Sequence, residues 1–222
     1  MKRLLFALFI ATPLFAQDAA SILARVDAAR NPLTSFSVEV QLTTNAGESS
    51  KFRVYGKGSD RSVVEFLAPA SEKGKFLLML RDAMWIYLPS ASRPIRISPL
   101  QRLMGQASNG DVARTNFMTD YNATSVATDN GEWLLDLAAK DPSIAYARVK
   151  LWVDKTTNEP VRADFYVVSG KLIKRARYHD HGRRVEIEDL LRTGNTTVMQ
   201  YSSLAARENP DKMFTKDALG KW

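Results

Sequence analysis

Residues 74–121 decide the fold, with GKFLLML (Gly74–Leu80), DAMWIYLP (Asp82–Pro89) and SPLQRLMGQASNGDVARTNFMTDY (Ser98–Tyr121). The first two pieces are short apolar runs, which are typical of strands. The third piece begins with a serine that can cap a helix and a proline at the position favoured for the first helical residue. We therefore expect two strands followed by a helical flap rich in Leu, Met and Phe, which would cover an apolar ligand.

The flap is expected to have two helical parts. The first begins at Pro99 and ends at Gly105, a common helix terminator, and its apolar side chains form one edge. Residues 106–110 are small and polar, which predicts a turn. Asp111 can cap a second short helix over residues 112–118.

Apolar and polar side chains alternate on both sides of this stretch, as in SFSVEVQLTT (Ser35–Thr44). In the second half, the turn residues Gly170, Gly182 and Gly194 fall twelve residues apart, which is typical of regular hairpins. Before the strands, residues 18–31 have the apolar spacing of a helix. The pattern predicts one mainly β domain, a long antiparallel sheet or barrel of about 11 to 13 strands with three helical pieces.

A secretory signal is predicted at the N-terminus. Lys2 and Arg3 precede an apolar run, and the stretch that ends at Ala16 is typical of a cleavage site. We expect residues 1–16 to be a signal peptide cleaved near Ala16, and residues 17–222 to be a single domain in the periplasm. An uncleaved membrane anchor is the alternative, which the shortness of the run disfavours.

Composition narrows the function classes. The chain has no cysteine, so it cannot be stapled by disulfides, and its formal net charge is +7. The densest basic set lies between residues 171 and 184, where it fits either contact with anionic headgroups or a solvated strand face. We favour the solvated face. No helix concentrates this charge, so nucleic acid is not an expected partner.

Residues for catalysis or metal binding are few. His179 and His181 are the two histidines, and a metal site needs three or four ligands, so a polar hairpin end is favoured over a metal site. A serine-nucleophile motif and a phosphate loop are also missing. We expect a carrier without a cofactor rather than an enzyme. A cofactor-free enzyme stays open, and it would need Asp111, Glu65 or Tyr121 to face the cavity.

A set of short motifs is spread over most of residues 19–215. They are GKFL (Gly74–Leu77), MWIYLP (Met84–Pro89), RIS (Arg96–Ser98), GQASNGD (Gly105–Asp111), NF (Asn116–Phe117), DY (Asp120–Tyr121) and LWVDK (Leu151–Lys155). In these motifs the chain resembles the outer-membrane lipoprotein-sorting protein family. Members of this family are relatives of the periplasmic carriers LolA and LolB.

The resemblance implies a half-open antiparallel β-barrel of about 11 strands, with an N-terminal helix and a helical flap over the concave face. Its cavity would bind lipid or lipoprotein acyl chains and pass them between inner and outer membrane systems. An inner-membrane transporter and an outer-membrane acceptor would be its partners, and we expect a monomer. The alternative is a lipid-sensing accessory or regulatory protein of an RND-type transporter or of an envelope-stress pathway.

The residues expected to line the cavity are the apolar side chains of the early strands and of the flap. They are Val40, Phe52, Val54, Val64, Phe66, Leu78, Leu80, Trp85, Tyr87, Leu100, Leu103, Met104, Phe117, Met118 and Tyr121.

Overall fold

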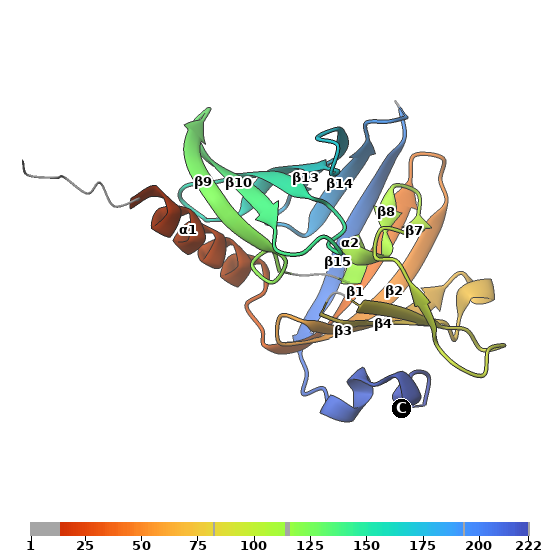
Figure 1. The fold of residues 1–222 in the computed structure, drawn as a ribbon. Coiled ribbons are helices and arrows are strands. Elements are labelled where there is room, and N and C mark those ends of the chain that lie inside the picture. Colours follow the sequence, from red (N-terminus) through yellow and green to blue (C-terminus); the bar gives the residue numbers. More distant parts are fainter. Residues whose placement is uncertain (1–13, 82, 114–115, 193, 222) are drawn as a thin grey trace, which may run out of the picture.

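A single antiparallel sheet of thirteen strands dominates the computed structural model, which describes residues 14–81, 83–113, 116–192 and 194–221 (Figure 1). The strands are β1 (Ser35–Thr44), β2 (Ser49–Lys57), β3 (Arg61–Ala68), β4 (Phe76–Leu80), β5 (Ala83–Tyr87), β6 (Ile95–Ile97), β9 (Tyr121–Asp129), β10 (Glu132–Ala139), β11 (Arg148–Val153), β12 (Pro160–Tyr166), β13 (Leu172–His179), β14 (Arg184–Asp189) and β15 (Thr196–Ala206). The prediction of a mainly β fold is confirmed.

The sheet consists of two meanders joined at their centre. Its order is β6-β5-β4-β3-β2-β1-β15-β14-β13-β12-β11-β10-β9, so the first and last strands pair in the middle. The edges, β6 and β9, are not paired with each other, and the sheet curves without closing (Figure 1). The expected barrel is therefore an open, curved sheet, which the term half-open fits only loosely.

The N-terminal helix α1 (Leu14–Arg30) packs beside β9 at one edge of the sheet. Its apolar residues Ile22, Leu23 and Val26 are buried in the main core, because their spacing places them on one helical face. The helix predicted over residues 18–31 is confirmed, although it starts earlier. Leu14–Ala16, assigned to the signal peptide, begin α1, and the rest of that segment lies outside the described residues.

Alternation along the strands builds two apolar clusters, one on each face. The main core lies on the concave face, under α1 and residues 107–121. A smaller cluster lies on the outer face of β2–β5, where the C-terminal tail covers it with Met213, Phe214 and Leu219. The tail contains two short 3-10 helices, η2 (Asp211–Phe214) and η3 (Lys216–Ala218), and a third, η1 (Ala70–Glu72), follows β3.

Residues 98–121 are here called the covering segment, and its described parts, 98–113 and 116–121, lie inside the curve of the sheet (Figure 1). These parts contain a small hairpin, β7 (Arg102–Met104) and β8 (Ala107–Ser108), and one short helix, α2 (Asn109–Ala113). The helix predicted from Pro99 to Gly105 is wrong. Of the second one, predicted over residues 112–118, residues 112–113 are helical, residues 116–118 are not, and residues 114–115 lie outside the described residues. The expected helical flap is a hairpin followed by a single helical turn.

Backbone hydrogen bonds explain this difference. The Leu100 amide donates to the Ser98 hydroxyl at 3.2 Å, and the Gly110 amide donates to the Pro99 carbonyl at 2.9 Å. The first bond is local, and the second joins Pro99 to the start of α2 across the hairpin instead of continuing a helix. Gly105, with a φ of 54°, then reverses the chain, in a left-handed conformation that glycine adopts without strain.

Candidate ligand-binding cavity

A cavity of about 90 Å³, here called the inner cavity, lies between the covering segment and strands β12–β15. The strands contribute mostly apolar side chains to it, namely Phe165, Ala176, Tyr178, Val185, Ile187, Met199 and Tyr201. The covering segment forms the opposite wall with Ser108, Gly110, Asp111, Asn116, Phe117, Asp120 and Tyr121. Arg30, Ala145, Tyr146 and Lys174 complete the lining. The inner cavity is thus an apolar space with a few charged groups at its margin.

An ion pair fastens the covering segment to the sheet. Lys174 on β13 points inward, and its Nζ lies 2.5 Å from Asp111 Oδ2, with each side chain only 12% exposed. Asp111 also accepts hydrogen bonds from the Ser108 amide at 2.8 Å and from the Tyr146 hydroxyl at 3.3 Å. Three donors therefore engage the Asp111 carboxylate, and two of them, Lys174 and Tyr146, belong to the opposite side of the cavity, so Asp111 acts as a clamp on the covering segment.

The pKa shifts of Lys174 and Tyr146 are consistent with this ion pair. Burial disfavours the ammonium form of Lys174, but the nearby Asp111 carboxylate outweighs it, so the pKa of Lys174 lies above its usual range. Burial, with the negative charge of Asp111 as a second cause, raises the pKa of Tyr146 to about 12. At neutral pH the lysine is charged and the tyrosine hydroxyl stays protonated and able to donate.

A second clamp joins the covering segment to α1. Asp27, which is 8% exposed, accepts the Phe117 amide at 2.8 Å and the Met118 amide at 2.7 Å. Burial raises the pKa of Asp27, and the two amide bonds and the charge of Arg30 only partly oppose this. Because these amides belong to a turn, the carboxylate satisfies donors that the backbone leaves unpaired.

Arg30 marks the place where the inner cavity meets a wider groove. This open groove, of about 1300 Å³, runs between the end of α1, the β13–β14 turn and the last residues of β15. Arg30 and Tyr201 line both spaces. The guanidinium carbon of Arg30 lies 4.8 Å from the centre of the Phe117 ring and 5.8 Å from that of Tyr178. A cationic side chain therefore lies between the inner cavity and the open groove.

The structure divides the residues expected to line the cavity into separate groups. Phe117 and Tyr121 line the inner cavity, with their ring centres 6.4 Å apart. The early-strand residues are packed in the main core beside it, and these are Val40, Phe52, Val54, Val64 and Phe66. In the covering segment, Leu103 and Met104 pack against this core, whereas Leu100 and Met118 are exposed.

Four of the expected residues lie on the other face of the sheet, namely Leu78, Leu80, Trp85 and Tyr87. They pack in the outer cluster under the C-terminal tail, so the expectation that they share one cavity with the others is wrong. On β4 and β5 it is Leu77, Met79 and Met84 that face the main core. Both faces of these strands are apolar, so alternation gives no sign of which face is inward.

Sequence reasoning missed the strand wall of the inner cavity, on β12–β15. Lys174 belongs to the basic set for which a solvated face is expected, but its side chain is turned inward and pairs directly with Asp111. The available signal was parity, since Lys174, Ala176 and Tyr178 share one face of β13. Arg30 carried no local signal, because its role depends on a contact with a distant segment.

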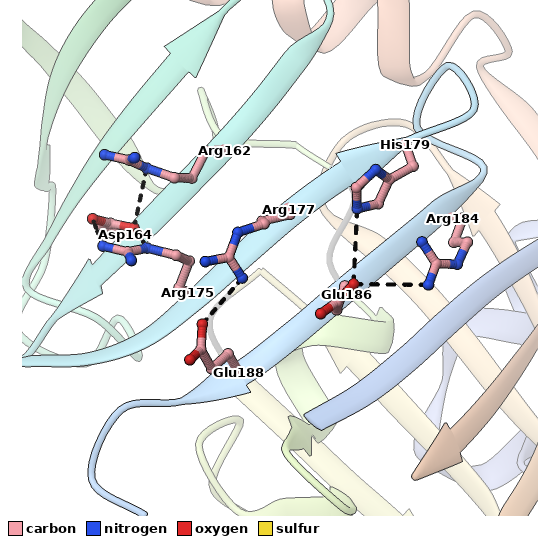
Figure 2. Close-up of polar contacts among 8 residues, drawn as sticks. All are labelled: Arg162, Asp164, Arg175, Arg177, His179, Arg184, Glu186 and Glu188. Atoms are coloured by element: carbon pink, nitrogen blue, oxygen red, sulfur yellow. Dashed lines mark hydrogen bonds and ion pairs between the residues drawn. The ribbon is translucent and has the colours of Figure 1, made fainter. Parts of the chain in front are cut away.

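The rest of that basic set lies where a solvated strand face was expected. Figure 2 shows a ladder of charges on the outer face of β12–β14. Arg175 Nε donates to Asp164 Oδ1 at 2.6 Å, and Arg177 reaches Glu188 at 3.0 Å. Each arginine in this ladder is paired with an aspartate or glutamate, so much of the positive charge is neutralised within the sheet.

The two histidines and Glu65 do not line the inner cavity. His181 Nδ1 lies 3.0 Å from Glu159, while His179 lies 4.0 Å from Glu186 on the outer face (Figure 2). Among the described residues, no group of three or more His, Cys, Asp or Glu side chains could hold a metal ion. Glu65 accepts the Tyr55 hydroxyl at 2.8 Å and does not face the inner cavity, whereas Asp111 and Tyr121 do.

No helix within the described ranges is long and apolar enough to cross a membrane.

Comparison with known proteins agrees with this architecture. A family model described as an uncharacterized protein matches residues 58–221. The crystal structure of a LolA superfamily protein from Nitrosomonas europaea is 39% identical, with a TM-score of 0.83, and the match covers 93% of this chain and 100% of that one. A search of curated proteins found no match.

Two further crystal structures share the fold at lower identity. An outer membrane lipoprotein-sorting protein domain from Vibrio parahaemolyticus is 19% identical with a TM-score of 0.75, over 93% of this chain and 100% of that one. A DUF1329 family protein from Desulfovibrio piger is 24% identical with a TM-score of 0.75, over 92% of this chain and 98% of that one. Together with the nearly full-length match at 39% identity, these findings show that the chain belongs to the LolA superfamily.

Proposed function

We propose that this protein is a periplasmic carrier that holds lipid or lipoprotein acyl chains between the covering segment and β12–β15. The observation that supports this most is the apolar inner cavity beneath a segment held by a few polar clamps. In this proposal residues 1–16 are a cleaved signal peptide, and residues 17–222 act as one monomeric domain. Its partners are an inner-membrane transporter and an outer-membrane acceptor.

The size of the inner cavity determines how a ligand would bind. At about 90 Å³ it is smaller than the roughly 300–1,000 Å³ of typical ligand pockets. An acyl chain can enter only if the covering segment moves away from the sheet. In this proposal the two clamps at Asp27 and Asp111 contribute to the free energy of opening.

Binding of this kind needs no covalent step. Each methylene removed from water contributes about 0.8 kcal/mol, so eight to ten of them contribute roughly 6–8 kcal/mol before the costs of association. Opening the clamps subtracts from that gain, which leaves a moderate affinity. A carrier requires this, because it must release its ligand to a membrane that offers the chain an equally apolar environment.

Native mass spectrometry of the mature protein, purified with gentle extraction, tests the proposal. We expect a fraction of molecules to carry lipid-sized adducts, and the emptied protein to take up a fluorescent fatty acid. A clean unliganded mass together with no uptake would contradict the proposal. A stable complex with a protein partner that fatty acid dissociates would instead favour the regulatory role in a transporter or stress pathway.

A further inference from the structure

Arg30 is a charged group at the inner cavity that has no hydrogen-bond or ion-pair partner among the described residues. It ends α1, is partly exposed, and lines both the inner cavity and the groove. Its guanidinium lies over the rings of Phe117 and Tyr178, yet it makes no hydrogen bond or ion pair with any residue that the structure describes. A guanidinium carries five N–H donors, so this group can bind an acceptor supplied from outside.

Two tyrosine hydroxyls accompany this guanidinium. Tyr178 and Tyr201 both line the inner cavity, and the charge of Arg30 acts on both hydroxyls. Burial raises the pKa of Tyr178, and it raises the pKa of Tyr201 to about 12, so both remain protonated donors at neutral pH. The contact of the Tyr201 hydroxyl with Met199 Sδ, at 3.4 Å, is weak.

The neighbouring carboxylates are already engaged. Asp27 accepts two backbone amides, and Asp111 is paired with Lys174. Asp120, which also lines the inner cavity, has interactions of its own. These acidic groups therefore leave Arg30 available, and an incoming anion would find its guanidinium together with two tyrosine hydroxyls among the residues that line the inner cavity.

We propose that Arg30, Tyr178 and Tyr201 bind the carboxylate of a long-chain fatty acid whose tail occupies the inner cavity. This inference rests on the proposed carrier function and names its ligand class. A carboxylate fits because its two oxygens match the planar fork of a guanidinium, while the faces of that fork stay stacked on the rings. A single chain fits because the closed cavity is small, so one tail needs less movement of the covering segment than two or three.

Displacement of a fluorescent fatty acid by palmitate and by hexadecanol tests the carboxylate site. The two competitors share a tail and differ in the charged head. For the wild-type protein we expect palmitate to bind about 10- to 100-fold more tightly, the range expected for hydrogen bonds to a charged group. In Arg30→Gln this preference should disappear while hexadecanol affinity stays the same, and Arg30→Lys, which keeps the charge without the fork, should be intermediate.

Arg25→Gln is the matched control. Arg25 is an exposed arginine on the same helix, where it donates to Asn158 Oδ1 at 3.0 Å, outside the inner cavity. We expect this variant to keep the wild-type preference. Unchanged hexadecanol affinity in Arg30→Gln shows that the cavity is still folded.

Three results would overturn the assignment. Equal affinity for palmitate and hexadecanol, unaffected by Arg30→Gln, would reject the carboxylate site and leave the carrier proposal standing. Stronger binding of palmitoyl lysophosphatidate than of palmitate would assign the site to a phosphate head instead. Failure of every long-chain competitor and of the fluorescent probe to bind would reject the carrier function itself.

Discussion

Replacing Lys174 by methionine removes the ammonium group that neutralises Asp111 beneath the covering segment. Both side chains are 12% exposed, so the variant leaves a nearly buried carboxylate without its counter-charge. Removing one partner of a buried ion pair costs about 3–5 kcal/mol, and the residual exposure of this pair favours the lower end. For a domain of this size, a loss of about 3 kcal/mol lowers the melting temperature by roughly 6–12 °C.

The same change should make the covering segment easier to open. In the open form Asp111 is solvated, so the penalty falls mainly on the closed form. A shift of about 3 kcal/mol corresponds to roughly a hundredfold larger open population. We therefore expect faster hydrogen exchange of amides in residues 98–121, together with faster association of a fluorescent fatty acid in stopped-flow measurements.

Lys171→Met is the matched control, because Lys171 is an exposed lysine in the turn before β13. It should leave exchange, association and melting temperature close to wild type. A Lys174→Met protein that melts earlier, but exchanges and binds at wild-type rates, would refute the role of this pair as a clamp on access. It would then be a purely structural contact.

Three other changes test separate parts of the account. Ala176→Leu places extra carbon atoms in the inner cavity, where Ala176 is 4% exposed, and we expect it to weaken fatty acid binding at least tenfold at a cost in stability of about 1–3 kcal/mol; unchanged binding would mean that the chain sits elsewhere. Asp27→Asn should flatten the pH dependence of stability measured by chemical denaturation. Because burial raises the folded-state pKa of Asp27, its contribution to stability is complete below the unfolded-state pKa and is lost as pH rises through the folded-state value, so wild type should lose stability relative to the variant over that window. A wild-type curve parallel to that of the variant would contradict this. Asn209→Ala removes donors to two buried backbone carbonyls, at 2.8 and 3.0 Å, and should cost about 2 kcal/mol of unfolding free energy while leaving ligand affinity unchanged; a loss of affinity would connect the tail to the cavity.

Alternation predicts the sheet well where one face is polar. On β1 and β2 the inward residues Val40, Leu42, Phe52 and Val54 alternate with polar ones, and they face the core as expected. On strands where both faces are apolar, alternation does not show which face is turned toward the core. β4 reads FLLML because its outer face is covered by the C-terminal tail, which a local pattern cannot reveal.

The covering segment shows a different limit. Ser98 and Pro99 are good helix starters, and Leu100, Leu103 and Met104 have the i, i+3, i+4 spacing of a helix, but the segment folds as a hairpin on the sheet. Packing decides this outcome, since a Cβ at Gly105 would lie 2.3 Å from Thr197 Oγ1 and the chain can pass there only as glycine. Tertiary contacts of this kind override helix propensity.

The charged margin of the inner cavity was the least predictable part. Lys174 pairs with Asp111, which lies 63 residues away in the sequence, and Arg30 on α1 stacks on the ring of Phe117 in the covering segment. A run of basic residues on one strand does not distinguish the inward lysine from the outward Arg175 unless the parity of the strand is known. That parity depends on pairing with β12 and β14, which is set by the whole sheet.

The central claim is that an acyl chain lies between the covering segment and the inner face of β12–β15. Photocrosslinking with a fatty acid that carries a diazirine on its tail, followed by peptide mapping, tests it most directly. We predict crosslinks in residues 108–121 and in residues 165–201. Crosslinks confined to residues 76–87 and 213–219, on the outer face, would contradict the account.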